Sequence, residues 1–340
     1  MRTIVLLFAA TLASAVTAAP PPAATHAPAV APAASAAPAA SASAPTTPAV
    51  DLNLPPATER FAVGTLHVRR YGDHGRPLIL IPGLGSGAWV WAPTVERLRG
   101  SHVIYALTLA GFDGTPPPAQ AAGLLDQADA SLLKLIRSRH IDHPVLVGHS
   151  LGGTLAIRFA TEHGDLLAGV VAVDGLPVFP GMQDMPAAQR AEQAQALKAQ
   201  IGKLTPLQFK AQQLGYMRMI GVHDAALAER LATLSARSDP ATTAEYMAED
   251  VTADYRPGLQ RVGVPLLEIM PWDAADAARI AAIRGGTFTR DDKLGLYRAI
   301  LKGAPQVTVE PIDNARHFAM LDQPQAFAAA LDGFLDDLRP

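Results

Sequence analysis

The stretch VLVGHSLGG, residues 145–153, joins a short apolar run to a single serine with glycines on both sides. The run VLV predicts a buried strand, and the spacing of apolar residues from 151 to 163 predicts a helix directly afterwards. The five residues GHSLG (148–152) match the pattern G-x-S-x-G, in which a sharp strand-to-helix turn exposes the serine hydroxyl. We therefore expect Ser150 to adopt a rarely populated backbone conformation, with its hydroxyl group held in open space.

The same alternation of strand and helix extends in both directions from this turn. Short apolar runs separated by helix-like segments of 10–18 residues predict an α/β fold, with a mostly parallel sheet and helices on both faces. Residues 61–72 alternate like an antiparallel edge strand. The apolar runs interpreted as the other strands are LILI, VIYALTL, VLV, GVVAV, LLEIM and VTVEPI.

Residues 180–259 interrupt this alternation, because they contain no strand-like run and show helical spacing over 187–201, 206–220 and 224–234. An insertion of this kind predicts a helical cap over the carboxyl ends of the strands, where open α/β sheets bind ligands. We therefore expect a core domain from residues 58–179 and 260–340, with the cap at 180–259.

The N-terminal residues have a different character. Residues 1–19 carry one positive charge, an apolar stretch and small residues, which is typical of a secretory signal peptide. Residues 20–57 are rich in alanine and proline and predict a disordered linker. We expect export to the periplasm or the medium, with no stable membrane span after signal cleavage, since no later apolar run approaches ~20 residues.

The overall composition excludes several partners. The net charge is −3 in 340 residues, which gives no basic excess for nucleic-acid binding. The chain has no cysteine, so no disulfide contributes to its stability. Dinucleotide, nucleotide-phosphate and zinc motifs are also missing from the sequence, and we expect no cofactor and no metal. The oligomeric state is not predicted.

Three stretches occurring in order resemble the α/β-hydrolase family: LILIPGLGSGAWVW, VLVGHSLGG and ARHFAMLDQPQAFAAALDGFL. The resemblance covers residues 61–338. It implies the α/β-hydrolase fold, with an eight-stranded, mostly parallel sheet and a helical cap inserted after the sixth strand. It also implies that Ser150 is the nucleophile, that a later histidine is the base and that an acid completes the set. The serine argues against the haloalkane dehalogenase and epoxide hydrolase branches, which use aspartate.

The candidates for the base and the acid follow from their positions after the expected strands. His317 follows the last strand after a five-residue turn and matches the family's base. A carboxylate must accept its Nδ1 proton and stabilise the imidazolium. The family most often takes this acid from the loop after the seventh strand, which favours Asp273, with Asp276 as an alternative. Asp174, after the sixth strand, occupies the other position that the family uses, and its competing role is to hydrogen-bond the loop leading into the cap.

Acyl transfer also needs donors for the developing oxyanion. The backbone amide of Leu151 lies at the N-terminus of the helix after the serine, and Leu84 matches the family's second donor, in the glycine-rich loop after LILIPG.

These observations predict an exported serine hydrolase that cleaves a carboxylic ester with an apolar acyl or alcohol part. An amide or peptide hydrolase, similar to iminopeptidases, and a cofactor-free perhydrolase are alternatives on the same site. A non-catalytic ligand-binding protein of the same fold is the alternative from another class.

Overall fold

The computed structural model describes residues 50–338, apart from the side chains of residues 283 and 284. The expected signal peptide and linker residues 20–49 lie outside the described residues. The last part of the expected linker, residues 50–57, runs along the core, where Leu52 is buried. Arg230 donates a hydrogen bond to the backbone oxygen of Val50 at 2.7 Å. The packed part of the chain therefore begins some residues before the core boundary expected at residue 58.

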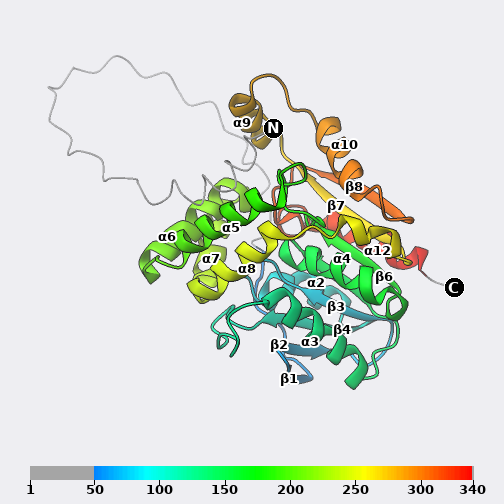
Figure 1. Cartoon of the computed structure of the whole chain (residues 1–340). Coiled ribbons are helices and arrows are strands. Elements are labelled where there is room, and N and C mark those ends of the chain that lie inside the picture. The colour runs from blue at the N-terminus through cyan, green and yellow to red at the C-terminus, as the bar shows by residue number, and fades with distance from the viewer. Residues whose placement is uncertain (1–49, 339–340) are drawn as a thin grey trace, which may run out of the picture.

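The core is an eight-stranded sheet in the order β1-β2-β4-β3-β5-β6-β7-β8 (Figure 1). The strands β1 and β2 pair antiparallel with each other and β2 pairs antiparallel with β4, whereas β3 to β8 are parallel. This confirms the predicted mostly parallel sheet. The strands are β1 (Glu59–Val63), β2 (Leu66–Tyr71), β3 (Pro77–Ile81), β4 (Val103–Leu109), β5 (Val145–His149), β6 (Gly169–Val173), β7 (Leu266–Trp272) and β8 (Val307–Asp313).

The edge of the sheet differs from the single strand expected over residues 61–72. The chain instead forms a hairpin, in which β1 turns into β2 through Gly64 and Thr65. Gly64 has a φ of 56°, a left-handed conformation that glycine adopts without strain. The alternation of side chains continues through the two-residue turn, so the pattern alone does not reveal it.

Helices cover both faces of the sheet, as predicted. One apolar cluster packs α3, α4 and α10 against one face, and a second packs α2 and α12 against the other. The core helices are α2 (Ala92–Leu98), α3 (Leu124–Ser138), α4 (Leu151–His163), α9 (Ala274–Arg284), α10 (Arg290–Leu301), α11 (Ala319–Asp322) and α12 (Pro324–Asp337), with 3₁₀ turns η1 (Ala88–Trp91), η2 (Gly164–Leu166) and η4 (Arg256–Arg261). Helices α9 and α10 were not predicted from the sequence.

The cap lies between β6 and β7, which is the insertion point predicted after the sixth strand. Its helices lie together beside the core in Figure 1. Helix α6 ends at Tyr216, and the chain continues as a π turn, η3, instead of the expected helix to residue 220. The cap elements are α5 (Ala187–Ile201), α6 (Pro206–Tyr216), η3 (Met217–Gly221), α7 (Ala225–Ser235) and α8 (Pro240–Thr252).

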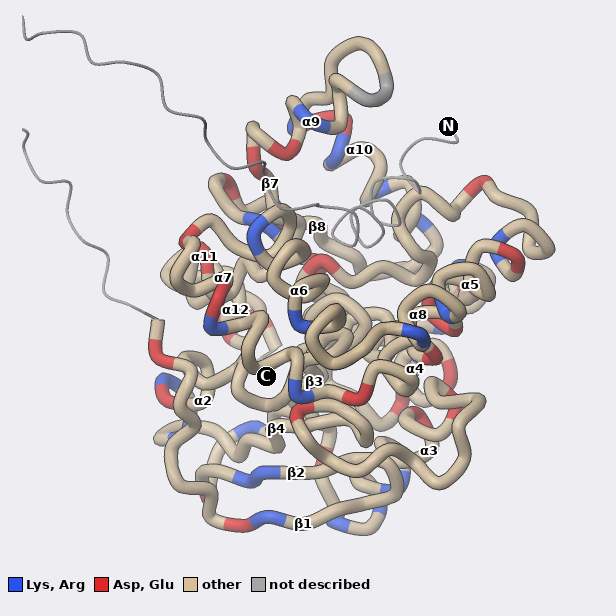
Figure 2. The backbone as a smooth tube through the Cα atoms, turned by 90° about the vertical axis from the view of Figure 1, so that its left-hand side faces the viewer, with Lys and Arg blue, Asp and Glu red and all other residues tan. Residues whose placement is uncertain are grey.

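The charged residues of both signs are interspersed over cap and core in the view of Figure 2. Within residues 50–338, no helix has both the length and the apolar character needed to cross a membrane.

Candidate active site

The predicted turn at Ser150 joins β5 to α4. Ser150 has φ 53° and ψ −123°, outside the regions that side-chain-bearing residues usually adopt. Its backbone N–H donates a hydrogen bond to the oxygen of Val173 at 2.9 Å, which ties the turn to β6. A Cβ atom added at Gly148 would lie 2.1 Å from the oxygen of Gly152, so only glycine fits there. The close approach of strand and helix therefore holds Ser150 in a strained conformation, partly exposed.

Two backbone segments flank Ser150. Leu151 is the first residue of α4, so its amide belongs to the positive N-terminal end of the helix. On the other side is the loop after β3, where a Cβ atom added at Gly83 would lie 3.1 Å from the Cβ atom of Ser150. Leu84, the next residue, is half-buried. Both expected oxyanion donors are thus on segments next to the serine.

His317 is buried in the loop between β8 and α11. This loop lies at the carboxyl ends of the parallel strands, as does the turn that carries Ser150. Its Nδ1 atom lies 2.6 Å from Oδ2 of Asp174, the residue that follows β6. Asp174 has a φ of 50°, and its N–H donates to the oxygen of Ile269 on β7 at 3.0 Å. Since the carboxylate accepts the Nδ1 proton, the Nε2 atom carries the lone pair of the neutral ring.

Helix α10 supports this carboxylate. The hydroxyl group of Tyr297 donates a hydrogen bond to Oδ1 of Asp174. Burial by itself raises the pKa of Asp174, but Lys293, His317 and Tyr297 together outweigh burial and hold this pKa well below its usual range. Lys293 also donates to the oxygen of Pro271 at 2.6 Å, which fixes the position of its charge. Asp174 is therefore ionised throughout the neutral pH range.

The acid favoured by the sequence, Asp273, has other partners. Its Oδ1 accepts the backbone N–H of Asp276 at 2.8 Å as the N-cap of α9, and its Oδ2 lies 3.3 Å from Nε2 of His223. Asp276 lies 3.6 Å from Nε of Arg316. Burial, the largest of several influences, raises the pKa of Asp276 to about 6. Because α9 starts directly after β7, the helix N-terminus uses the Asp273 carboxylate, and the structure brings Asp174 to His317 instead.

His149, on the strand side of Ser150, packs behind the base. Its ring centroid is 4.6 Å from that of His317 and 4.4 Å from that of Phe318. Its Nε2 atom lies 3.0 Å from the backbone oxygen of His317. Burial, followed by the nearby His317, lowers the pKa of His149 well below its usual value, so the ring is neutral and Nε2–H is the donor in this pair. His149 therefore fixes the loop that carries His317.

The cap holds the same loop from the other side. The N–H groups of His317 and Phe318 donate to the oxygens of Ile220 and Gly221, at 3.1 and 3.0 Å. These two acceptors belong to the π turn η3, and turns of this type are frequent at functional sites. The ring of Tyr216, just before the turn, stands edge-on to the ring of His317 at 6.1 Å. The position of the base thus depends on the cap as well as on the core.

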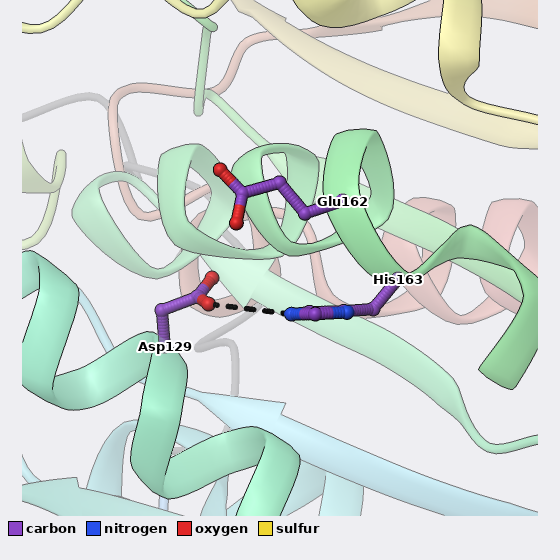
Figure 3. Close-up of side chains that lie close together, drawn as sticks. All are labelled: Asp129, Glu162 and His163. Atoms are coloured by element: carbon purple, nitrogen blue, oxygen red, sulfur yellow. Dashed lines mark ion pairs between the residues drawn. The ribbon is translucent and has the colours of Figure 1, made fainter.

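A second group of polar side chains lies on α3 and α4, at the far end of α4 from Ser150. Ligand atoms of Asp129, Glu162 and His163 are all within 4.8 Å of one another, close enough to be considered for a metal ion (Figure 3). However, Nε of Arg158 lies 3.6 Å from Oδ1 of Asp129, and Nε2 of His163 lies 3.8 Å from its Oδ2. Burial raises the pKa of Asp129 to about 6, and the charge of Arg158 only partly opposes it. We interpret the group as an ion-pair network joining the two helices.

Sequence reasoning did not identify the groups that surround Asp174. Tyr297 and Lys293 lie on α10, a segment whose composition gave no indication of its role. Glu268 had a recognisable signal, because it is the one charged residue in the apolar run LLEIM, but the sequence does not say which neighbour it faces.

Comparison with known proteins identifies the family of the chain. A family model described as "Alpha/beta hydrolase family" matches residues 78–330. The chain is 26% identical over 278 residues to the 1-acylglycerol-3-phosphate O-acyltransferase ABHD5 of Rattus norvegicus, covering 74% of each chain. It is 27% identical over 275 residues to the N-formylmaleamate deformylase of Pseudomonas putida, covering 79% of this chain and 92% of the relative.

Among solved structures, a thermophilic esterase from Thermogutta terrifontis matches with a TM-score of 0.65 and 19% identity, over 83% of this chain and 100% of the esterase. The enol-lactonase from Burkholderia xenovorans matches with a TM-score of 0.60 and 20% identity, over 82% of this chain and 100% of the lactonase. At these identities the two structures establish a shared fold.

Proposed function

Since this chain belongs to the α/β hydrolase family, we propose that it is a serine hydrolase that cleaves a carboxylic ester through an acyl-enzyme on Ser150. The observation that carries the proposal is the 2.6 Å contact between His317 Nδ1 and Asp174 Oδ2, at the sheet edge where the Ser150 turn lies. A nucleophile, a base and a group that orients the base are the three parts that such chemistry requires.

In the proposed reaction, Nε2 of His317 takes the proton of Ser150 as its Oγ attacks the ester carbonyl. The amides of Leu151 and Leu84 donate hydrogen bonds to the oxyanion that forms. His317 then gives its proton to the leaving alcohol, and the acyl group stays on Ser150. Water, activated by the same ring, attacks the acyl-enzyme, and the carboxylic acid product leaves.

Asp174 supports the step in which His317 becomes positive. The lowered pKa of Asp174 means that this carboxylate stays ionised when the ring gains its second proton. A mostly buried negative charge beside Nδ1 stabilises the imidazolium more strongly than an exposed charge would, because little water screens it. The carboxylate also keeps the proton on Nδ1 of the neutral ring, so that the lone pair which accepts the serine proton is on Nε2.

Active-site labelling and a substrate panel test this function. Incubation with a fluorophosphonate probe should modify Ser150, identified by peptide mass spectrometry, and heat-denatured protein should not react. Esters with apolar acyl or alcohol parts should be hydrolysed faster than matched amides and proline-terminal peptides. Labelling with faster amide cleavage would instead support the amide hydrolase, an activity closer in kind to the relative named N-formylmaleamate deformylase.

A non-catalytic ligand-binding protein is the candidate from another class. Such a protein would need neither a carboxylate near His317 nor a strained serine, and the contacts of Asp174 therefore favour the enzyme. Absence of labelling at Ser150 in folded protein would favour the binding protein. Export is a further part of the proposal, and N-terminal sequencing of the mature protein tests it by looking for cleavage near residue 19.

A further inference from the structure

Ser238, a buried residue of the cap, contacts the loop that carries one of the two proposed oxyanion donors. It lies between α7 and α8 and is only 3% exposed. Its Oγ atom donates a hydrogen bond to the backbone oxygen of Gly85 at 2.9 Å. Gly85 follows Leu84 in the loop after β3. The cap therefore reaches the proposed oxyanion site through a hydroxyl group that the reaction described above does not use.

A second contact of this hydroxyl group fixes the direction of its proton. The backbone N–H of Asp113, in the loop after β4, donates to Oγ of Ser238 at 3.0 Å. A backbone amide nitrogen can only donate, so Oγ is the acceptor in this pair and its own proton is left for the oxygen of Gly85. The Ser238 hydroxyl group thus bridges two loops of the core, as an acceptor from one and as a donor to the other.

From Gly85, hydrogen bonds between peptide groups lead to the proposed donor. The oxygen of Gly85 belongs to the same peptide group as the N–H of Ser86, and this N–H donates to the oxygen of Gly83 at 3.1 Å. The oxygen of Gly83 belongs in turn to the peptide group whose N–H is that of Leu84. Gly85 has a φ of 66°, as glycine does at the third position of a tight turn. Two linked peptide groups therefore connect the Ser238 hydroxyl group to the N–H of Leu84.

The segment that carries Ser238 is held on the core by its backbone. The N–H of Asp239 donates to the oxygen of Gly111 at 2.7 Å, and the oxygen of Arg237 accepts the N–H of Gly114 at 3.0 Å. Neither bond involves the Ser238 side chain. The hydroxyl group therefore adds a directed contact to a segment that is already in place, and we expect a variant without the hydroxyl group to keep the segment there.

We propose that Ser238 is a positioning residue for the oxyanion site: its hydroxyl group holds the turn after β3 so that the N–H of Leu84 is directed at the oxyanion formed when Ser150 attacks the ester. A donor of this kind is effective at about 2.7–3.1 Å from the oxyanion, so a small rotation of its peptide group weakens the interaction. Linked hydrogen bonds also polarise one another, which strengthens the last donor of the series. The inference rests on the proposed function.

The kinetic test compares a variant without the hydroxyl group with one that keeps it. For Ser238→Ala we expect kcat on an ester to fall about tenfold with KM little changed, less than the loss of about 10²–10³-fold when a donor itself is deleted. Ser238→Thr should have a kcat within about threefold of wild type. Ser235→Ala is the matched control and should leave kcat unchanged, because Ser235 is a buried serine at the end of α7 whose hydroxyl group has no hydrogen-bond partner among the described residues.

A transition-state analogue separates the oxyanion site from the rest of the pocket. With an alkyl trifluoromethyl ketone, Oγ of Ser150 adds to the carbonyl carbon, its proton goes to His317, and the carbonyl oxygen becomes the oxyanion. The Ki of this ketone should rise about tenfold in Ser238→Ala, in step with the fall in kcat/KM. The Ki of the corresponding secondary alcohol, which has no carbonyl carbon to attack, should not change. A merely structural role would not distinguish these two ligands.

Backbone amide resonances give a readout that needs no ligand. In proton–nitrogen NMR spectra, the resonances of Leu84 and Ser86 should shift in Ser238→Ala, return in Ser238→Thr and stay in place in Ser235→Ala. If Ser238→Ala does not fold, Ser238→Cys replaces it with the same expected results, since a thiol is only a weak hydrogen-bonding group.

A folded Ser238→Ala protein with wild-type kcat overturns the proposal, and so does one in which only KM changes or one that Ser235→Ala matches in its loss of kcat. A folded Ser238→Thr protein as slow as Ser238→Ala also overturns it. If wild-type protein hydrolyses no ester and Ser150 is not labelled, the proposed function fails, whereas the amide resonances still decide whether Ser238 holds the turn.

Discussion

Replacing Ser150 with alanine is expected to lower kcat for ester hydrolysis by a factor on the order of 10⁶, equivalent to about 8 kcal/mol of transition-state stabilisation. The loss is this large because the acyl-enzyme cannot form without the hydroxyl group, and His317 then has no serine proton to accept. The oxyanion donors remain, so turnover about 10³-fold above the uncatalysed rate should persist. The measurement is kcat on the best ester of the panel, with fluorophosphonate labelling in parallel.

The fold of the Ser150→Ala protein should be almost unchanged. Within residues 50–338, the Ser150 side chain makes no capping hydrogen bond to α4, so its removal leaves no helix amide newly unpaired. Alanine tolerates a φ of 53° no better and no worse than serine, because both carry a Cβ atom. Free energies of unfolding from urea titrations should therefore agree within about 1 kcal/mol. A folded variant that keeps more than a few per cent of wild-type kcat would exclude Ser150 as the nucleophile.

The turn at Ser150 could be predicted because its cause is local. Gly148 is needed because the helix starts within a few residues of the strand and its backbone lies against Gly148, whereas Gly152 lies against the backbone of Ile81 and Pro82 after β3. The sequence shows both glycines at the spacing of the G-x-S-x-G pattern. The alternation of strands and helices, and its interruption by the cap, are likewise patterns within short windows, and the fold they predict is confirmed. The hairpin β1–β2 was not predicted, because the alternation of side chains continues through its turn. The helices α9 and α10 were not predicted, because their sequence does not repeat a helical spacing strongly enough.

The choice among the carboxylates is different in kind, because it depends on contacts between distant segments. Asp273 lies where the family usually has its acid, but α9 begins one residue later and uses its side chain as a cap. Asp174 is favoured by Tyr297 and Lys293, which are more than 100 residues away and reach it only after α10 packs against the sheet. Spacing along the chain cannot report such contacts.

A comparison of Asp174→Asn with Asp273→Asn separates these two carboxylates. Asp174→Asn is expected to lower kcat by a factor on the order of 10⁴, because an amide can donate to Nδ1 and so stabilise the wrong tautomer of His317. Asp273→Asn should leave kcat within about threefold of wild type, since asparagine is an equally good N-cap for α9. The measurement is kcat and KM for both variants on one ester, at a pH where wild type is fully active.

The Asp174→Asn variant should also change how the stability of the fold depends on pH. Because the pKa of Asp174 is lower in the folded protein than in the unfolded chain, its ionised form stabilises the fold above the unfolded value of about 3.9. That contribution disappears as the pH falls through the lower, folded pKa. Asp174→Asn should therefore be less stable than wild type near pH 7, with a difference that shrinks as the pH is lowered below about 4.

If Asp273→Asn instead loses the larger share of kcat while Asp174→Asn stays active, the acid is Asp273, and the contact between Asp174 and His317 serves the loop that leads into the cap. If both variants lose activity together, Asp273 must also act on the site. It would then act through Arg316, the residue before His317, because Arg316 Nε lies 3.8 Å from Asp273 Oδ1. Only a loss of activity confined to Asp174→Asn agrees with a base that is oriented from the end of β6.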